Sequence, residues 1–174
     1  SSGASVGVSL GGDGGEGAKS DQVHVNNNAD IYTKGFDSTG ILAQSIGGNG
    51  GTGGLSISAA VGTQGASLAL GGEGGGGGIS KEAFIHNTGT IRTDGAGSSA
   101  LVSQSIGGSG GNGGGSVTGA FGGGALTFSL GSNGGAGGQA GISKIHSIGN
   151  LETVGDNSTA VVAQSIGGTG GNAG

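Results

Sequence analysis

The chain lacks proline, cysteine, methionine and tryptophan, and aromatic residues are scarce. Its 174 residues include four Phe and one Tyr. Without cysteine there is no disulfide and no zinc–thiolate site, an absence that fits a reducing compartment or an exported protein that travels unfolded. So few large apolar side chains cannot fill one conventional core. The composition therefore favours thin layers that stabilise one another by stacking.

Positive charge is also scarce. Five Lys and Arg stand against ten Asp and Glu, which gives a net charge of −5. This balance argues against binding to nucleic acid or to anionic membranes, both of which need clustered cations. No apolar stretch is long enough to span a bilayer, and the first residues lack a signal-peptide pattern. We expect no membrane insertion by this segment, and we expect any export signal to lie outside it.

Glycine dominates what is present, with 51 residues. Inside a regular element each glycine costs about 0.5–1 kcal/mol relative to alanine. The glycines are therefore expected in turns or in tight backbone packing.

The sequence repeats at a spacing of 60 residues. The pentapeptide Gln44–Gly48 (QSIGG) returns at 104–108 and at 164–168 without a gap. Because both ends fall inside a unit, the chain is interpreted as an excerpt of a longer array. Its divisions are an incomplete first repeat (1–46), two full repeats (47–106 and 107–166) and the start of another repeat (167–174).

Within one unit, apolar residues alternate with small or polar residues, as in Leu55–Val61 and Ala66–Leu70. This alternation is typical of half-buried strands. Residues 62–65 (GTQG) between them are typical of a hairpin or corner turn. Further strands are expected near 81–86, 90–93 and 100–106. The predicted fold class is all-β: a repetitive β-solenoid of stacked β-layers with a 60-residue period and glycine-rich turns or polyglycine-like runs.

Stacking in register would bring residues that are 60 positions apart, which we call residues of equal phase, together in ladders along the axis. Stacked amides can satisfy one another's hydrogen-bond donors and acceptors, so an internal glutamine ladder is favoured over glutamines that line a binding groove. The glycines after each Gln-Ser-Ile are expected at a bend where a side chain would clash with the next layer. The predicted ladder residues are Gln44, Gln104, Gln164, Ile46, Ile106, Ile166, Gly47, Gly107 and Gly167. The number of layers in one period stays open.

The segment Ile41–Gly48 (ILAQSIGG), followed by GNGGTGG, resembles the glycine-rich repeats of giant bacterial autotransporter passengers. The resemblance covers essentially the whole chain. It implies an extracellular or cell-surface location, export through a C-terminal β-barrel, and a role in adhesion, biofilm or surface fibres. It supplies no catalytic residues. GGNGGTGG also resembles the repeats of the mycobacterial PGRS type, although the long intervening strands do not.

Motifs typical of enzymes occur against a background of abundant glycine. The G-x-S-x-G pattern of a nucleophile elbow is centred on Ser5, Ser9 and Ser109, but that motif requires a strand–turn–helix context. Gly17–Ser20 (GAKS) departs from a phosphate-binding loop because Ala18 replaces the glycine before lysine. We therefore predict no catalytic and no cofactor-binding residues.

Metal-binding patterns are incomplete. Gly11–Glu16 (GGDGGE) approaches a calcium-binding nonapeptide, but glutamate replaces the required aspartate and no tandem copy follows. His86 and His146 share a phase and His24 does not, and no ligand set accompanies them. The prediction is no cofactor and no metal site, with calcium as the alternative.

Two classes of function remain. The first is a structural or adhesive segment of a fibre, whose partners are like repeats in the same chain, sister chains, and a host or matrix surface. The alternative is a specific glycan- or surface-binding repeat module, which needs a flat repeated array of Thr, Asn or aromatic side chains. Aromatic residues are scarce here and threonine positions are single, which favours the fibre.

Stacked layers predict a meridional reflection at about 4.8 Å in fibre diffraction of oriented chains. If this reflection is absent, the stacked-layer fold is wrong.

Overall fold

The computed structural model describes residues 3–174; the first two residues of the incomplete first repeat lie outside it. The described residues form strands and irregular segments, without a helix. The strands are β1 (Ala4–Leu10), β2 (Val23–Asn27), β3 (Ile31–Thr33), β4 (Ile41–Ile46), β5 (Ser56–Val61), β6 (Gln64–Leu70), β7 (Ala83–Asn87), β8 (Ile91–Thr93), β9 (Leu101–Ile106), β10 (Ser116–Phe121), β11 (Leu126–Leu130), β12 (Ser143–Ser147), β13 (Leu151–Thr153) and β14 (Val161–Ile166).

The strands build parallel sheets that run along a stacking axis. Their orders are β1-β6-β11, β10-β5, β12-β7-β2, β13-β8-β3 and β14-β9-β4. Partners in each ladder carry equal phase in the sequence repeat, as Gln44 pairs with Gln104 and Gln104 with Gln164. The all-β, stacked-layer architecture expected from the sequence is therefore confirmed.

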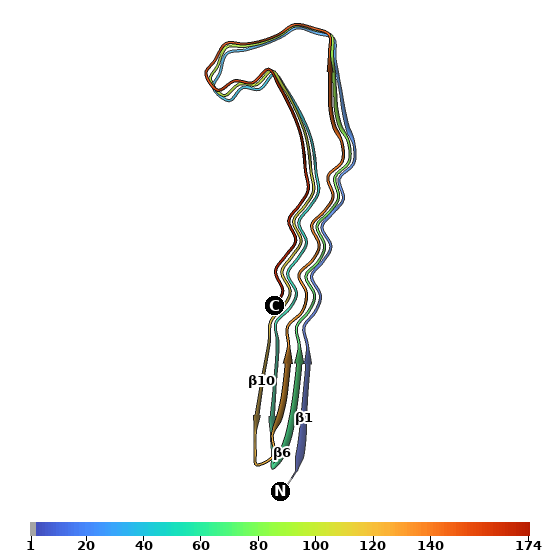
Figure 1. The fold of residues 1–174 in the computed structure, drawn as a ribbon, viewed down its shortest axis with the longest axis vertical. Coiled ribbons are helices and arrows are strands. Elements are labelled where there is room, and N and C mark those ends of the chain that lie inside the picture. The colour runs from blue at the N-terminus through green and yellow to red at the C-terminus, as the bar shows by residue number, and fades with distance from the viewer. Residues whose placement is uncertain (1–2) are drawn as a thin grey trace.

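Viewed down the shortest axis, successive passes of the chain lie over one another as a long, narrow loop (Figure 1). At one end, which we call the tip, β5 and β10 face β1, β6 and β11. At the other end, the head, the remaining strands enclose a small core. Between tip and head lie two undulating segments: the first glycine run (11–19, 71–79 and 131–139) and the second glycine run (47–54, 107–114 and 167–174).

Backbone hydrogen bonds join the two glycine runs across the loop. Gly51 donates its N–H to the carbonyl of Gly15 at 2.7 Å, and Gly75 donates to Gly51 at 2.8 Å. Gly111 continues to Gly75, and Gly135 to Gly111. These bonds form an unbroken zigzag along the stacking axis, which pairs backbone groups that no β-ladder reaches.

A second set of bonds holds each run to its copy in the next layer. Gly14 donates to the carbonyl of Glu73 at 2.7 Å, and Gly74 donates to that of Asn133 at 2.9 Å. The two sets together give the runs a three-residue period. One residue bonds within the column, the next bonds across the loop, and the third faces outward.

The first two positions of each triplet admit almost only glycine. A Cβ on Gly74 would overlap the carbonyl of Gly111, and one on Gly75 would overlap that of Gly15. Ser132 occupies a crossing position, where its N–H lies 3.3 Å from the Gly114 carbonyl; the bond at the equivalent Gly72 is 3.1 Å. The Ser132 hydroxyl also accepts a hydrogen bond from the Gly114 N–H at 3.1 Å.

The head holds the one cluster of buried apolar residues found in residues 3–174. Ile85, Ile91 and Leu101 are fully buried at its centre. Each contributes about 1.5–3 kcal/mol by removal of apolar surface from water. Serines line the rest of the interior; the Ser103 hydroxyl, for example, donates to the carbonyl of Ala83 at 2.8 Å.

The bend between β3 and β4 requires a left-handed residue in each layer. Asp37, Gly97 and Asn157 occupy equivalent positions with φ of 50°, 71° and 55°. Asp, Gly and Asn are the residues that adopt this conformation at least cost. Three different residues therefore specify one turn.

Of the hairpin or corner turn expected at residues 62–65, the structure has the corner turn, because β5 and β6 belong to different sheets and the connection between them is an arch. The strands are half-buried, as expected, but their small side chains are buried and their large apolar side chains are exposed. Ser58, Ala60 and Ser67 face inward, whereas Ile57 and Leu68 face solvent.

The glycine runs generate a prediction from two neighbouring residues. Gly75→Ala places a Cβ onto the Gly15 carbonyl, and we expect it to lower the free energy of unfolding by about 3 kcal/mol. Gly76→Ala is the matched control. It points outward, its Cβ would lie 3.2 Å from the flexible Glu16 carboxylate, and we expect a change within about 0.5 kcal/mol. Urea denaturation compares the two, and equal losses would contradict this account of the runs.

Candidate functional site

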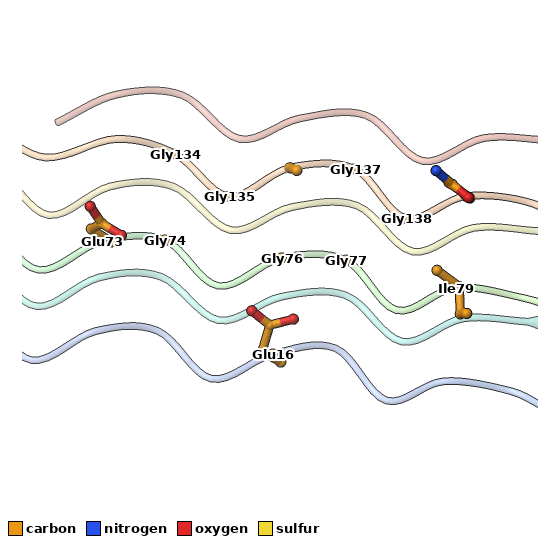
Figure 2. Close-up of a pocket in the computed structure, with 12 residues that line it drawn as sticks. Glu16, Glu73, Gly74, Gly76, Gly77, Ile79, Gly134, Gly135, Gly137 and Gly138 are labelled. Carbon is orange, nitrogen blue, oxygen red and sulfur yellow. The ribbon is translucent and has the colours of Figure 1, made fainter.

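The outward positions of the glycine runs form a shallow polar surface. In Figure 2, Glu16 and Glu73 project from neighbouring passes of the first run, above a floor of glycine backbone. The surface continues to Ile79 and Gln139. It is open, and glycine supplies most of its lining, so its side chains do not converge on one point.

Outward side chains in these runs accept hydrogen bonds from the next layer. The Asp13 carboxylate accepts from the N–H of Glu73 at 2.8 Å. The Asn49 carbonyl oxygen accepts from Ser109 N–H at 2.9 Å, and that of Asn112 from Asn172 N–H at 3.0 Å. Each side chain thus satisfies an outward backbone donor that no other run reaches.

The three glutamines of the repeat form a chain of hydrogen bonds. Gln44 Nε2 donates to Gln104 Oε1 at 2.6 Å, and Gln104 Nε2 donates to Gln164 Oε1 at 2.7 Å. They lie on the outer face of β4, β9 and β14, because Ile41, Ala43 and their equivalents take the inward positions. The amide ladder is thus on the surface and not internal.

The isoleucines and glycines of the predicted ladder also stack. Ile46 and Ile166 are about half exposed, at 51 % and 47 %, and Ile106 between them is partly covered. The N–H of Gly47 donates to the Ile106 carbonyl, and that of Gly107 to the Ile166 carbonyl, both at 2.8 Å. A Cβ on Gly47 or Gly107 would overlap a carbonyl of the first glycine run, at Gly78 or Gly138. Gly167 has more room, with Gly138 oxygen 4.0 Å from its ideal Cβ.

Charged residues gather on the outer face of β3, β8 and β13. Arg92 lies 2.8 Å from the Asp94 carboxylate and 2.7 Å from that of Glu152. The Tyr32 hydroxyl donates to Asp94. This hydrogen bond, followed by that from Arg92, lowers the pKa of Asp94, and the two carboxylates raise the pKa of Arg92.

The serines of the nucleophile-like motif have separate surroundings. Ser5 lies on β1 and donates to the Val61 carbonyl at 2.8 Å, and Ser9 lies on the same strand. Ser109 lies in the second glycine run, where its hydroxyl accepts from Thr169 at 3.2 Å. Lys19 of the GAKS segment extends from the first run. The fold does not bring these residues together.

The histidines lie on the outer face of the sheet β12-β7-β2. The rings of His86 and His146 stack at a centroid distance of 5.1 Å. His24 lies over the edge of Phe84, with Nε2 3.6 Å from the Glu82 carboxylate. Within residues 3–174, no group of three or more His, Cys, Asp or Glu side chains is arranged to hold a metal ion.

The head contains a buried amide that no sequence motif indicates. Asn87 is fully buried; its Nδ2 donates to the Gly89 carbonyl at 2.7 Å and to Ser147 at 3.1 Å, and its Oδ1 accepts from Asn27. The available signal was the equal phase of Asn27 and Asn87, each two residues before a turn. The amides of Asn27 and Asn87 hold that turn in the first two layers, and in the third layer the Ser147 hydroxyl donates to the Gly149 carbonyl at 3.4 Å.

Comparison with protein-family profiles, with curated proteins and with solved structures finds no match to this chain. In the part of the chain that the structure describes, no helix is long and apolar enough to cross a bilayer.

The charged face predicts acid sensitivity. Because the pKa of Asp94 is lowered in the folded chain, its ionised form stabilises the fold above the usual carboxyl range, and this contribution is lost as pH falls from that range through the lowered pKa. Asp94→Asn should therefore lower the thermal midpoint at pH 7, and its effect should shrink as pH falls below the usual carboxyl range. Tyr32→Phe should produce part of the same loss, because it removes the strongest partner of Asp94. Thermal melts across pH test this, and a pH-independent difference between wild type and Asp94→Asn would contradict it.

Proposed function

We propose that this chain is a structural repeat segment of a bacterial cell-surface or extracellular fibre. In this proposal each 60-residue unit forms one layer of a β-solenoid, and the glycine runs are polyglycine-type helices inside that layer. The main observation in support of this proposal is that strands 60 residues apart pair in register in every sheet, from Ala4 with Gln64 to Ile166 with Ile106. A further unit of the same length would extend every ladder at once.

The mechanism is extension. Each added layer lengthens the array by about 4.8 Å and satisfies the backbone groups of its neighbour. The zigzag of hydrogen bonds through Gly51, Gly75 and Gly111 runs along the same axis as the ladders. A fibre with this construction can carry a distal binding part away from the cell, in adhesion, biofilm or matrix scaffolding.

The resemblance of ILAQSIGG to giant autotransporter passengers supports the proposed surface location and export route. The proposed role is not catalytic and requires no cofactor. Its partners are like repeats, sister chains and a host or matrix surface. The open form of the polar surface around Glu16 and Glu73 favours this role over recognition of one small ligand.

Surface labelling and ligand binding test the proposal together. Antibodies against the folded segment should label intact cells of the source organism, and the isolated chain should show no saturable binding on a glycan array. Labelling only after cells are permeabilised would contradict the surface role. Saturable binding to one glycan, abolished by changing Gln44, Gln104 and Gln164 to Ala, would favour the specific binding module instead.

A further inference from the structure

The tip exposes apolar side chains on both of its outer sheet faces; on β5 and β10, for example, Ile57 and Phe121 are 63 % and 70 % exposed. The apolar side chains on the larger, three-stranded sheet of β1, β6 and β11 form what we call the tip face. Leu68, in the middle layer, is 37 % exposed, and the members on β1 and β11, in the first and last layers, are 57 % to 76 % exposed. The members are Val6, Val8, Leu10, Leu68, Leu126, Phe128 and Leu130.

The interior of the tip has no space for these large side chains. β1, β6 and β11 are packed against β5 and β10 through small side chains such as Ser58, Ala60 and Ala69. The hydroxyls of Ser56 and Ser67 are buried there without a hydrogen-bond partner among residues 3–174. The large apolar side chains of these strands must therefore face outward, since the space between the two sheets accommodates only small residues.

The apolar columns are continuous along the stacking axis. Val8 pairs with Leu68, and Leu68 pairs with Phe128. A shallow groove beside this column is lined by Val6, Ala66 and Leu126. The face is thus a set of apolar ridges and grooves that repeats in each layer.

The tip carries no charge of either sign. Residues 3–10, 55–70 and 115–130 contain no Asp, Glu, Lys, Arg or His, so all charged residues lie in the glycine runs or the head. Two tip faces can therefore meet without electrostatic repulsion. A charged partner would find nothing complementary on this face.

The area of the tip face fits a weak contact that strengthens with array length. At roughly 100 Å² per fully exposed side chain, the seven residues present about 400 Å² of apolar surface. That is about half of the roughly 800 Å² that each partner contributes to a standard stable interface, and it lies within the range of about 300–600 Å² for the largest apolar patch on a typical monomer. Each added layer adds further apolar side chains to the face.

We infer that the tip face packs against the tip face of a second copy of this chain. Such a contact is isologous, with the same residues on both sides. A second array has the same spacing between layers, so the ridges of one copy can meet the grooves of the other over its whole length, as in a dry β-zipper. The pairing deepens the proposed fibre role and rests on it for the supply of neighbouring copies.

A lipid bilayer is the competing partner for an apolar face. Insertion of the tip would carry its arch, including Thr63 and Gln64, into hydrocarbon. There the polar groups of an irregular connection have no water to bond. A second copy buries the same apolar residues and leaves the arch in water.

Sedimentation equilibrium of the 174-residue chain in solution tests the inference. Wild type should dimerise reversibly at high micromolar concentration, more strongly in ammonium sulfate, which strengthens apolar association. The combined variant Val8→Thr, Leu68→Thr and Phe128→Thr should associate at least tenfold more weakly, because it removes one whole column. Threonine preserves the strand preference of these positions.

The matched control changes an apolar column on the head to the same residue: Leu42→Thr, Val102→Thr and Val162→Thr. These positions pair in the sheet β14-β9-β4, and dimerisation should be unchanged in this variant. An equal loss in the control, or a wild type that stays monomeric at every concentration, would overturn the inference. So would a monomeric wild type that binds phosphatidylcholine vesicles through the tip column.

Single cysteines give an answer even if the combined variant fails to fold. The chain has no natural cysteine, so Leu68→Cys and Leu42→Cys each introduce one thiol. Under mild oxidation Leu68→Cys should form disulfide dimers at least tenfold faster than Leu42→Cys, and equal rates would overturn the inference. Because both measurements use purified chain, their result is independent of whether the chain is found on cell surfaces.

Discussion

The structure depends on hydrogen bonds between glycine backbones that approach too closely for a side chain. The zigzag through Gly15, Gly51, Gly75 and Gly111 sets the distance between the two glycine runs. A shift by one residue would move an outward side chain into one of these contacts. The runs therefore hold the layers to one length and one register, and they transmit that register to the head and the tip at their two ends.

Head and tip use the same strand alternation in opposite ways. In the head, Ile85, Ile91 and Leu101 fill a core and the charged side chains face water. In the tip, serine, alanine and glycine fill the interior, and the larger apolar residues face outward. The buried apolar cluster lies in the head, whereas the apolar side chains of the tip remain exposed and free to associate. A long, thin layer can divide these tasks because its two ends share no core.

Side chains of equal phase form ladders throughout the stack, and their position decides what they contribute. The exposed amides of Gln44 and Gln104 bond to each other in water, where one such bond contributes about 1 kcal/mol or less. The amide of Asn87 is buried, so removal of any of its partners would leave a polar group unsatisfied. Stacking places both residues, but only burial makes the loss of the Asn87 hydrogen bonds costly.

The sequence by itself determined the repeat and the strands, because period and alternation are local patterns. The strands expected near 90–93 and 100–106 correspond to β8 and β9 within a residue. Only the tertiary structure decided which half of each alternation faces inward. Alternation defines two faces of a strand, but packing against the opposite sheet decides which face lies inward. On β6 the small residues Ser67 and Ala69 lie inward and Leu68 lies outward. For the same reason Gln104 lies outside and Asn87 inside, since burial depends on segments far apart in the chain.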